Sequence, residues 1–74
     1  MKNKIYARLD NTKVGDKVCV FMLGKYREFE VVKITSRTLK VKGTFISEEV
    51  FYYQSSVCGG YFRNFVHNPV YKVN

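Results

Sequence analysis

The sequence contains no tryptophan, only two cysteines, only six acidic residues and no long apolar run. Two cysteines are too few for a disulfide framework, and we expect both to stay reduced in a cytosolic protein. No stretch approaches the run of about 18 apolar residues that crosses a bilayer, so we expect no membrane partner. The basic start of the chain, residues 1–6, also lacks the apolar stretch of a secretory signal, which predicts a cytoplasmic protein.

Aromatic residues are abundant, with six Phe and six Tyr within an apolar fraction of 46%. The 74 residues suffice for a single domain spanning 1–74. A domain near this size buries only about 60% of the surface that its unfolded chain exposes, so its core is thin. Rings that each bury on the order of 150–250 Å² are an efficient way to fill such a core.

The charge balance is strongly basic, because thirteen lysines and arginines against six acids give a formal net charge of +7. An excess of this size favours phosphate backbones, anionic membranes or an acidic protein patch as partners. The alternative is that the charge only keeps a small protein in solution.

An alternating apolar pattern follows a Gly-Asp turn and predicts a strand over Lys17–Met22. Leu23–Lys25 is typical of a hairpin connection, and the longest strand is expected over Tyr26–Thr35. Within that strand the apolar side chains change face between Val31 and Val32, which predicts a β-bulge or a sharp bend.

The second half of the chain gives weaker strand signals. Thr38–Lys42 alternates cleanly, while Ser47–Glu49 places a cap residue before two acids and predicts one short helical turn. Val50–Gln54 fits either a strand or a short helix. The remaining strand candidates, including a tail that pairs as an edge, are Lys2–Leu9, Thr44–Ile46, Tyr61–His67 and Val70–Asn74.

Three segments, Val14–Val18, Phe29–Thr35 and Leu39–Phe45, carry a likeness to a known superfold. Their order resembles the SH3-like barrel, including its KOW and Tudor-type modules. The Val-Gly-Asp opening and the Lys33–Thr35 tripeptide are also similar to small barrels encoded by bacteriophages and their hosts. We therefore expect an all-β fold, an SH3-like antiparallel barrel of five to six strands with at most one short helical turn. Since side chains fill so small a barrel, its function must lie on the outer surface.

A basic ribbon covers residues 33–42, which hold four positive charges and no acid: Lys33, Arg37, Lys40 and Lys42. Lys40 and Lys42 share one strand face. Such clusters contact phosphates because lysine offers a mobile point charge and arginine a planar fork. The alternative is a solvated strand edge that lysines protect against aggregation.

Tyrosines beside basic residues add a second binding signal. Single-stranded nucleic acid is held by ring stacking next to a positive groove, and the candidate rings are Tyr26, Tyr52, Tyr53 and Tyr61, with Arg27 and Arg63 nearby. The alternative is that these rings close the core, the role that we expect for Phe45, Phe51 and Phe62.

The sequence does not indicate catalysis. Zinc needs about four ligands, and Cys58 and His67 have no partners at suitable spacing, so we expect neither a metal nor a cofactor. A Cys-His nucleophile would also need an orienting group and a pocket. We expect Cys19 to be a small buried apolar residue, and Glu28 and Glu30 to pair with cations across strands.

These observations predict a non-enzymatic β-barrel that binds DNA or RNA through Lys33, Arg37, Lys40, Lys42, Tyr52, Tyr53, Tyr61 and Arg63. The alternative is a phage-type interaction module that binds or inhibits an acidic host protein. Its signal is the segment Phe51–Phe65, which is aromatic and poor in charge, as interface centres are. A third hypothesis is a homo-oligomer that pairs exposed barrel edges.

Overall fold

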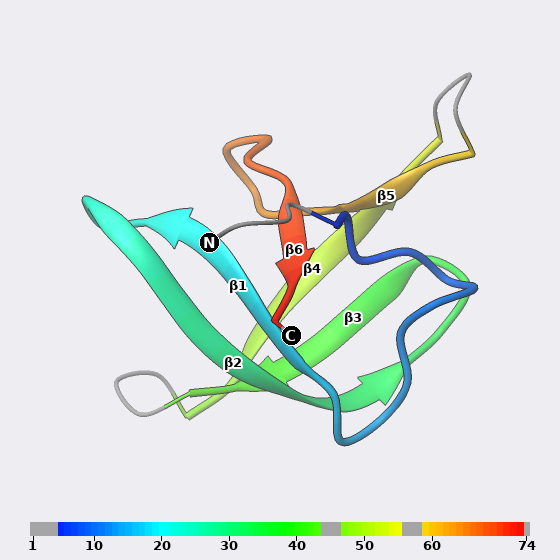
Figure 1. Cartoon of the computed structure of the whole chain (residues 1–74), viewed down its shortest axis with the longest axis horizontal. Helices are drawn as coiled ribbons and strands as arrows, with labels where there is room; N and C mark the ends of the chain where they lie inside the picture. Colours follow the sequence, from blue (N-terminus) through cyan, green and yellow to red (C-terminus); the bar gives the residue numbers. More distant parts are fainter. Residues whose placement is uncertain (1–4, 44–46, 56–58, 74) are drawn as a thin grey trace.

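A computed structural model describes residues 5–43, 47–55 and 59–73 of the chain. Six antiparallel strands form one sheet in the order β5-β4-β3-β2-β1-β6, and the sheet curls into a nearly closed barrel (Figure 1). The strands are β1 (Lys17–Met22), β2 (Lys25–Ile34), β3 (Thr38–Lys42), β4 (Glu49–Gln54), β5 (Tyr61–Arg63) and β6 (Val70–Lys72). The described ranges contain no helix, so the all-β prediction is confirmed.

Residues 5–8, which we name the closing segment, join the two outer strands of the sheet. The Ala7 amide donates to the Val70 carbonyl of β6 over 2.8 Å, and the Ala7 carbonyl accepts from the Phe62 amide of β5 over 2.9 Å. Both outer strands therefore gain hydrogen bonds from the same piece of chain, which lowers the exposure of unpaired strand edges.

The strand predicted over Lys2–Leu9 is wrong for the residues that the structure describes. That part of the chain forms only an isolated bridge between Tyr6 and Tyr71, and residues 2–4 lie outside the described residues. Ala7 is buried as the alternation implied, but Ile5 and Leu9 are exposed. The backbone of Ala7 is hydrogen-bonded to both β5 and β6, so the segment bridges the two strands without burying Ile5 or Leu9.

The hairpin between β1 and β2 follows the sequence prediction closely. Leu23 and Gly24 connect the strands with φ angles of 53° and 88°, and Met22 pairs with Lys25. Two residues with positive φ match the twist of the flanking strands, as type I′ turns do. The predicted bounds of Lys17–Met22 and Thr38–Lys42 are confirmed.

A β-bulge in β2 lies where the sequence predicted it. Val31 pairs with Val41 and Lys33 pairs with Lys40, so Val32 is an extra residue on the β2 side. The extra residue returns Ile34 to the interior, where it packs against the core. It also directs Lys33 to the outer surface.

The core is filled by side chains from every strand. Phe29 and Phe51 meet edge to face with ring centroids 5.5 Å apart, and Tyr53 meets Phe62 in the same way at 5.3 Å. The fully buried residues include Phe51, Phe62, Leu39, Val18, Val20, Val31, Val41 and Val70. Phe45, the other expected core ring, and the strand expected over Thr44–Ile46 lie outside the described residues.

Three expectations for the second half are settled by pairing across the sheet. The helical turn over Ser47–Glu49 is wrong, because Glu49 pairs with Val41 and begins β4. The ambiguous segment Val50–Gln54 is a strand for the same reason. The tail pairs as an edge, as expected, because β6 is an outer strand of the sheet that pairs with β1, and the closing segment adds backbone hydrogen bonds on its other side.

The strand predicted over Tyr61–His67 stops at Arg63. Asn64 is fully buried, the chain turns at residues 65–66, and His67 has a φ of 69°. Local hydrogen bonds of the Asn64 side chain replace strand pairing there. None of the described residues belongs to a helix that could span a bilayer.

Candidate functional site

Two lysines face each other on the outside of the barrel. Lys33 of β2 lies directly opposite Lys40 of β3, and both point outward because their neighbours Ile34, Leu39 and Val41 point into the core. Like charges in this position destabilise a sheet. The Lys40 ammonium lies 3.5 Å from a Glu48 carboxylate oxygen, whereas Lys33 forms no ion pair with any described residue. An anion between the two lysines would relieve their repulsion.

A polar row runs across β3, β4 and β5 next to the lysine pair. Thr38 pairs with Tyr52, which in turn pairs with Arg63. The Tyr52 ring is 46% exposed. The Arg63 guanidinium is held in place because its Nε donates to Gln54 Oε1 over 2.5 Å and its Nη1 donates to the Asn64 carbonyl over 3.0 Å. Arginine fixed in this way presents an ordered donor fork to a phosphate.

Arg37 lies at the end of this row, in the bend between β2 and β3. The bend is built by Thr35, whose Oγ1 accepts from the amides of Arg37 and Thr38 over 3.2 and 3.0 Å. The Arg37 carbonyl accepts from the Tyr53 amide over 2.8 Å, so the bend is attached to β4. The Arg37 side chain is exposed. We name the surface formed by Lys33, Arg37, Lys40, Tyr52 and Arg63 the cationic face.

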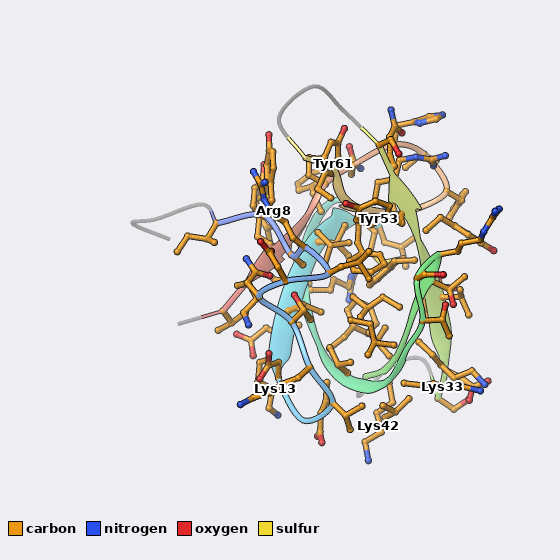
Figure 2. All side chains as sticks on the ribbon, turned by 90° about the vertical axis from the view of Figure 1, so that its right-hand side faces the viewer. Arg8, Lys13, Lys33, Lys42, Tyr53 and Tyr61 are labelled. Atoms are coloured by element: carbon orange, nitrogen blue, oxygen red, sulfur yellow. The ribbon has the colours of Figure 1, made fainter. Side chains whose placement is uncertain are left out.

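Lys42 shares the outer side of β3 with Lys40 but has acidic surroundings. It pairs with Glu30 across the sheet and lines a hollow of about 280 Å³ together with Lys17, Glu28 and Glu30. Lys17 and Glu30 lie 3.9 Å apart, as expected for a cross-strand pair of Glu30 with a cation. Figure 2 shows Lys33 at the side of the barrel and Lys42 pointing away from its base. Lys42 therefore belongs to a mixed-charge region next to the cationic face.

The two remaining tyrosines of the predicted site lie apart from the cationic face. Tyr53 is half-buried and packs its ring on Phe62 at the edge of the core, and its hydroxyl donates to the Gly59 carbonyl over 2.5 Å (Figure 2). Tyr61 points outward but contacts Tyr6, with ring centroids 4.9 Å apart. The structure thus joins the lysines, Tyr52 and Arg63, and assigns Tyr61 to a different cluster.

That cluster is a row of five rings on the outside of the barrel, which we name the aromatic ladder. Adjacent centroids lie 4.9 Å apart for Tyr61 and Tyr6, 5.4 Å for Tyr6 and Tyr71, 6.3 Å for Tyr71 and Tyr26, and 5.3 Å for Tyr26 and Phe21. The rings come from β5, the closing segment, β6, β2 and β1. Phe21, Tyr26 and Tyr6 are 43%, 46% and 37% exposed.

The sequence prediction included Tyr26 and Tyr61 among candidate rings but missed Tyr6, Phe21 and Tyr71. Each missed ring is next to a residue with no exposed surface, namely Ala7, Val20 or Val70. Strict alternation in an extended chain therefore directs the ring outward. This pattern was the available signal, but it could not show that the three rings join Tyr26 and Tyr61 in one row.

The Gly-Asp turn before β1 is fixed by an internal ion pair. The Lys72 ammonium lies 2.7 Å from Asp16 Oδ2, which also accepts from the Lys13 amide over 2.9 Å. The Lys72 bond, followed by the Lys13 bond, holds the pKa of Asp16 below its ordinary value. Lys72 is committed to Asp16 and to the Asn11 carbonyl, so we assign it no role in binding a partner.

The described residues that were candidates for metal or thiol chemistry form no cluster. Cys19 is buried, as predicted, and burial followed by the nearby Glu28 carboxylate raises the pKa of its thiol. His67 is exposed in the turn after Asn64, and Cys58 lies outside the described residues. Across the parts of the chain that the structure describes, no three His, Cys, Asp or Glu side chains are grouped to hold a metal ion.

The fold is thus a small six-stranded antiparallel barrel, nearly closed, and is consistent with the SH3-like barrel class. No known protein family, curated protein or solved structure matches the chain.

Proposed function

We propose that this chain is a non-enzymatic barrel that binds nucleic acid, DNA or RNA, through its cationic face. The observation that carries the proposal is the Lys33–Lys40 pair. Two outward lysines directly opposite each other repel. A phosphate bound between them would attract both ammonium groups and so offset this repulsion. The resemblance to KOW and Tudor-type modules supports the same conclusion.

The surroundings of the pair also support a polyanion. Tyr52 and the fixed guanidinium of Arg63 lie in the neighbouring row, and Arg37 extends the positive charge to the end of β3. The whole chain carries a net charge of +7, which attracts a phosphate backbone over several ångströms. Each phosphate neutralised by a lysine or arginine releases counterions, so affinity should fall steeply with salt.

Reversal of the lysine pair tests this proposal. We expect Lys33→Glu/Lys40→Glu to lower the affinity for a fluorescent 20-nucleotide oligonucleotide at least tenfold. The slope of log affinity against log salt should also become less steep, by about 0.7–0.9 for each phosphate contact that is lost. Fluorescence anisotropy over a salt series measures both quantities for DNA and for RNA.

A matched control separates this site from general charge. Lys13→Glu/Lys25→Glu makes the same charge change at two exposed lysines that form no ion pair with any described residue. The control should keep most of the affinity. Equal losses in both variants, or no binding by the unmodified protein, contradict a nucleic-acid site on the cationic face.

A second candidate function, a phage-type module that binds a host protein, is favoured by one loop. Phe65 and Val66 are 68% and 52% exposed at the turn between β5 and β6, while Asn64 anchors that turn from inside. Rigid exposed apolar residues are suitable anchors for a protein partner.

The test compares nuclease-treated pull-downs of the unmodified protein and of Phe65→Ser. A stoichiometric partner lost only in the variant supports this candidate, and identical pull-downs contradict it.

A further inference from the structure

We infer that the nucleic acid bound by this chain is single-stranded, with its bases stacked on the aromatic ladder. The inference rests on the proposed function, because it assigns the phosphates to the cationic face. It adds a second surface and selects one class of ligand. Unpaired bases can lie on exposed rings, whereas the bases of a duplex are already paired and stacked.

The ladder forms a second layer outside a core that is already complete. Behind its rings lie Ala7, Val20 and Val70, which have no exposed surface. The interior therefore needs no further rings for closure. A contiguous row of aromatic rings, of which Tyr6, Phe21 and Tyr26 are exposed, marks an interaction surface on a small protein.

The rings support one another in fixed orientations. Neighbouring planes are inclined by 35° to 73°, so the rings pack by edges and tilted faces rather than as a closed flat stack. Tyrosine and phenylalanine have only two side-chain torsions, and contacts between rings restrict these further. Little ordering entropy is then lost when a base binds.

The ladder is continuous with the cationic face through β5. Tyr61 and Arg63 are two residues apart on the outer side of that strand, because Phe62 between them is buried. Arg8, two residues after Tyr6, adds a cation to the closing segment and lines a hollow with Tyr53 and Gly59. Figure 2 shows Tyr61 toward the upper end of the barrel and Lys33 low on its side, so a ligand that reaches both must be extended along the barrel.

Charge argues for nucleic acid over a second copy of the chain. A dimer formed through the ladders would bring together two molecules that each carry a net charge of +7. A polyanion is complementary to the same surroundings. Glu28 follows Tyr26 on the outer side of β2, so a phosphate backbone is repelled beyond the Phe21–Tyr26 end.

The test compares a 12-nucleotide single strand with a duplex of the same sequence. We expect the unmodified protein to bind the single strand at least about tenfold more tightly. Tyr6→Ala/Tyr26→Ala should lower single-strand affinity at least about tenfold, while duplex affinity and the salt slope stay unchanged. Tyr6→Phe/Tyr26→Phe retains the rings and should retain binding. Phe65→Ala, an exposed ring outside the ladder, is the control.

Intrinsic fluorescence gives an independent readout. The chain has no tryptophan, so its emission comes from tyrosine, and stacked bases should quench it. We expect quenching by the single strand in the unmodified protein and weaker quenching in Tyr26→Ala. The single variant keeps the measurement informative if the double variant fails to fold, which circular dichroism would show.

The outcomes separate this inference from the proposed function. If Lys33→Glu/Lys40→Glu loses binding but the ladder variants bind single strands normally, the proposed function stands and the inference is overturned. Equal affinity for single strand and duplex also overturns it. A dimer in sedimentation that the ladder variants dissociate, with binding unchanged, would show that the ladder joins copies of the chain.

Discussion

Asn64 is a fully buried polar side chain that organises the turn between β5 and β6. Its Oδ1 accepts from the amides of Val66 and Asn68 over 3.1 and 2.9 Å, and its Nδ2 donates to the Phe21 carbonyl over 3.5 Å. The amides of Val66 and Asn68 are therefore hydrogen-bonded without a neighbouring strand. One side chain thus ends β5 and connects the turn to β1.

Truncation of Asn64 should be costly. Asn64→Ala leaves two amides without their acceptor, and we expect a loss of about 1–3 kcal/mol in the free energy of unfolding. Urea unfolding measures this loss, with the exposed Ser36→Ala as a control that should change stability by less than about 0.5 kcal/mol. An Asn64→Ala variant as stable as the unmodified protein contradicts this role.

Gly60 and Gly24 form a pair in which only the surroundings differ. Both have positive φ angles, 95° and 88°, but a Cβ at Gly60 would meet the Tyr53 hydroxyl and lie 2.9 Å from the Gln54 carbonyl oxygen. Nothing lies within 4 Å of a Cβ at Gly24. Gly24→Ala should cost about 1–2 kcal/mol for the backbone alone, and Gly60→Ala should cost distinctly more. Equal midpoints of thermal unfolding for the two variants contradict the crowding at Gly60.

At the scale of elements, the turn before β1 is attached to two other parts of the sheet. The Gly15 amide donates to the Val31 carbonyl and the Val31 amide donates to the Asp16 carbonyl, each over 2.9 Å. The Asp16 side chain meanwhile accepts from Lys72 of β6. The turn therefore connects the bulge region of β2 with β6.

This connection predicts a dependence of stability on acid. The pKa of Asp16 is lowered in the folded protein, so the carboxylate stabilises the fold above its unfolded pKa. That stabilisation is lost as pH falls through the lowered folded value. We expect Asp16→Asn to be less stable than the unmodified protein at pH 7, and the difference to shrink as the pH falls from the ordinary Asp pKa of 3.8 through the lowered folded value.

Thermal unfolding between pH 2 and pH 7 measures the difference. Asp10→Asn, which removes an exposed carboxylate in the preceding turn, is the control. A gap between Asp16→Asn and the unmodified protein that is the same at every pH contradicts the assignment.

Sequence patterns predicted the elements that depend on local alternation. The bounds of β1 and β3 and the bulge in β2 follow from which neighbouring side chains are apolar. The helical turn over Ser47–Glu49 failed because pairing of Glu49 with Val41 overrides a local cap signal. The extension of β5 failed because the burial of Asn64 depends on distant contacts, including the Phe21 carbonyl.

Prediction of the candidate site also succeeded where local alternation decides and failed where distant contacts decide. Strand register brings together Lys33, Lys40, Tyr52 and Arg63, and the alternating pattern predicted part of that register. The aromatic ladder needed Tyr6, Tyr71 and Tyr61 to meet through the closing segment, which no pattern within one element specifies. Tyr53 looked equivalent to Tyr52 in sequence, but alternation places it toward the core.

At the scale of the whole molecule, the barrel has a filled interior and two distinct outer surfaces that meet on β5. The cationic face supplies charge and the ladder supplies rings, whereas Glu28 and Glu30 give the region around Lys42 a mixed charge. We assign binding to the continuous path from Lys33 to Tyr61. Non-specific attraction by the net charge alone would use all exposed lysines equally.

Chemical-shift mapping of backbone amides during titration with a 12-nucleotide single strand distinguishes these two cases directly. We predict that the largest shifts occur at the amides of Lys33, Lys40, Tyr52 and Arg63, and that those of Lys13 and Glu30 move little. Shifts spread evenly over the surface, or concentrated around Glu28 and Glu30, would contradict a nucleic-acid site on the cationic face.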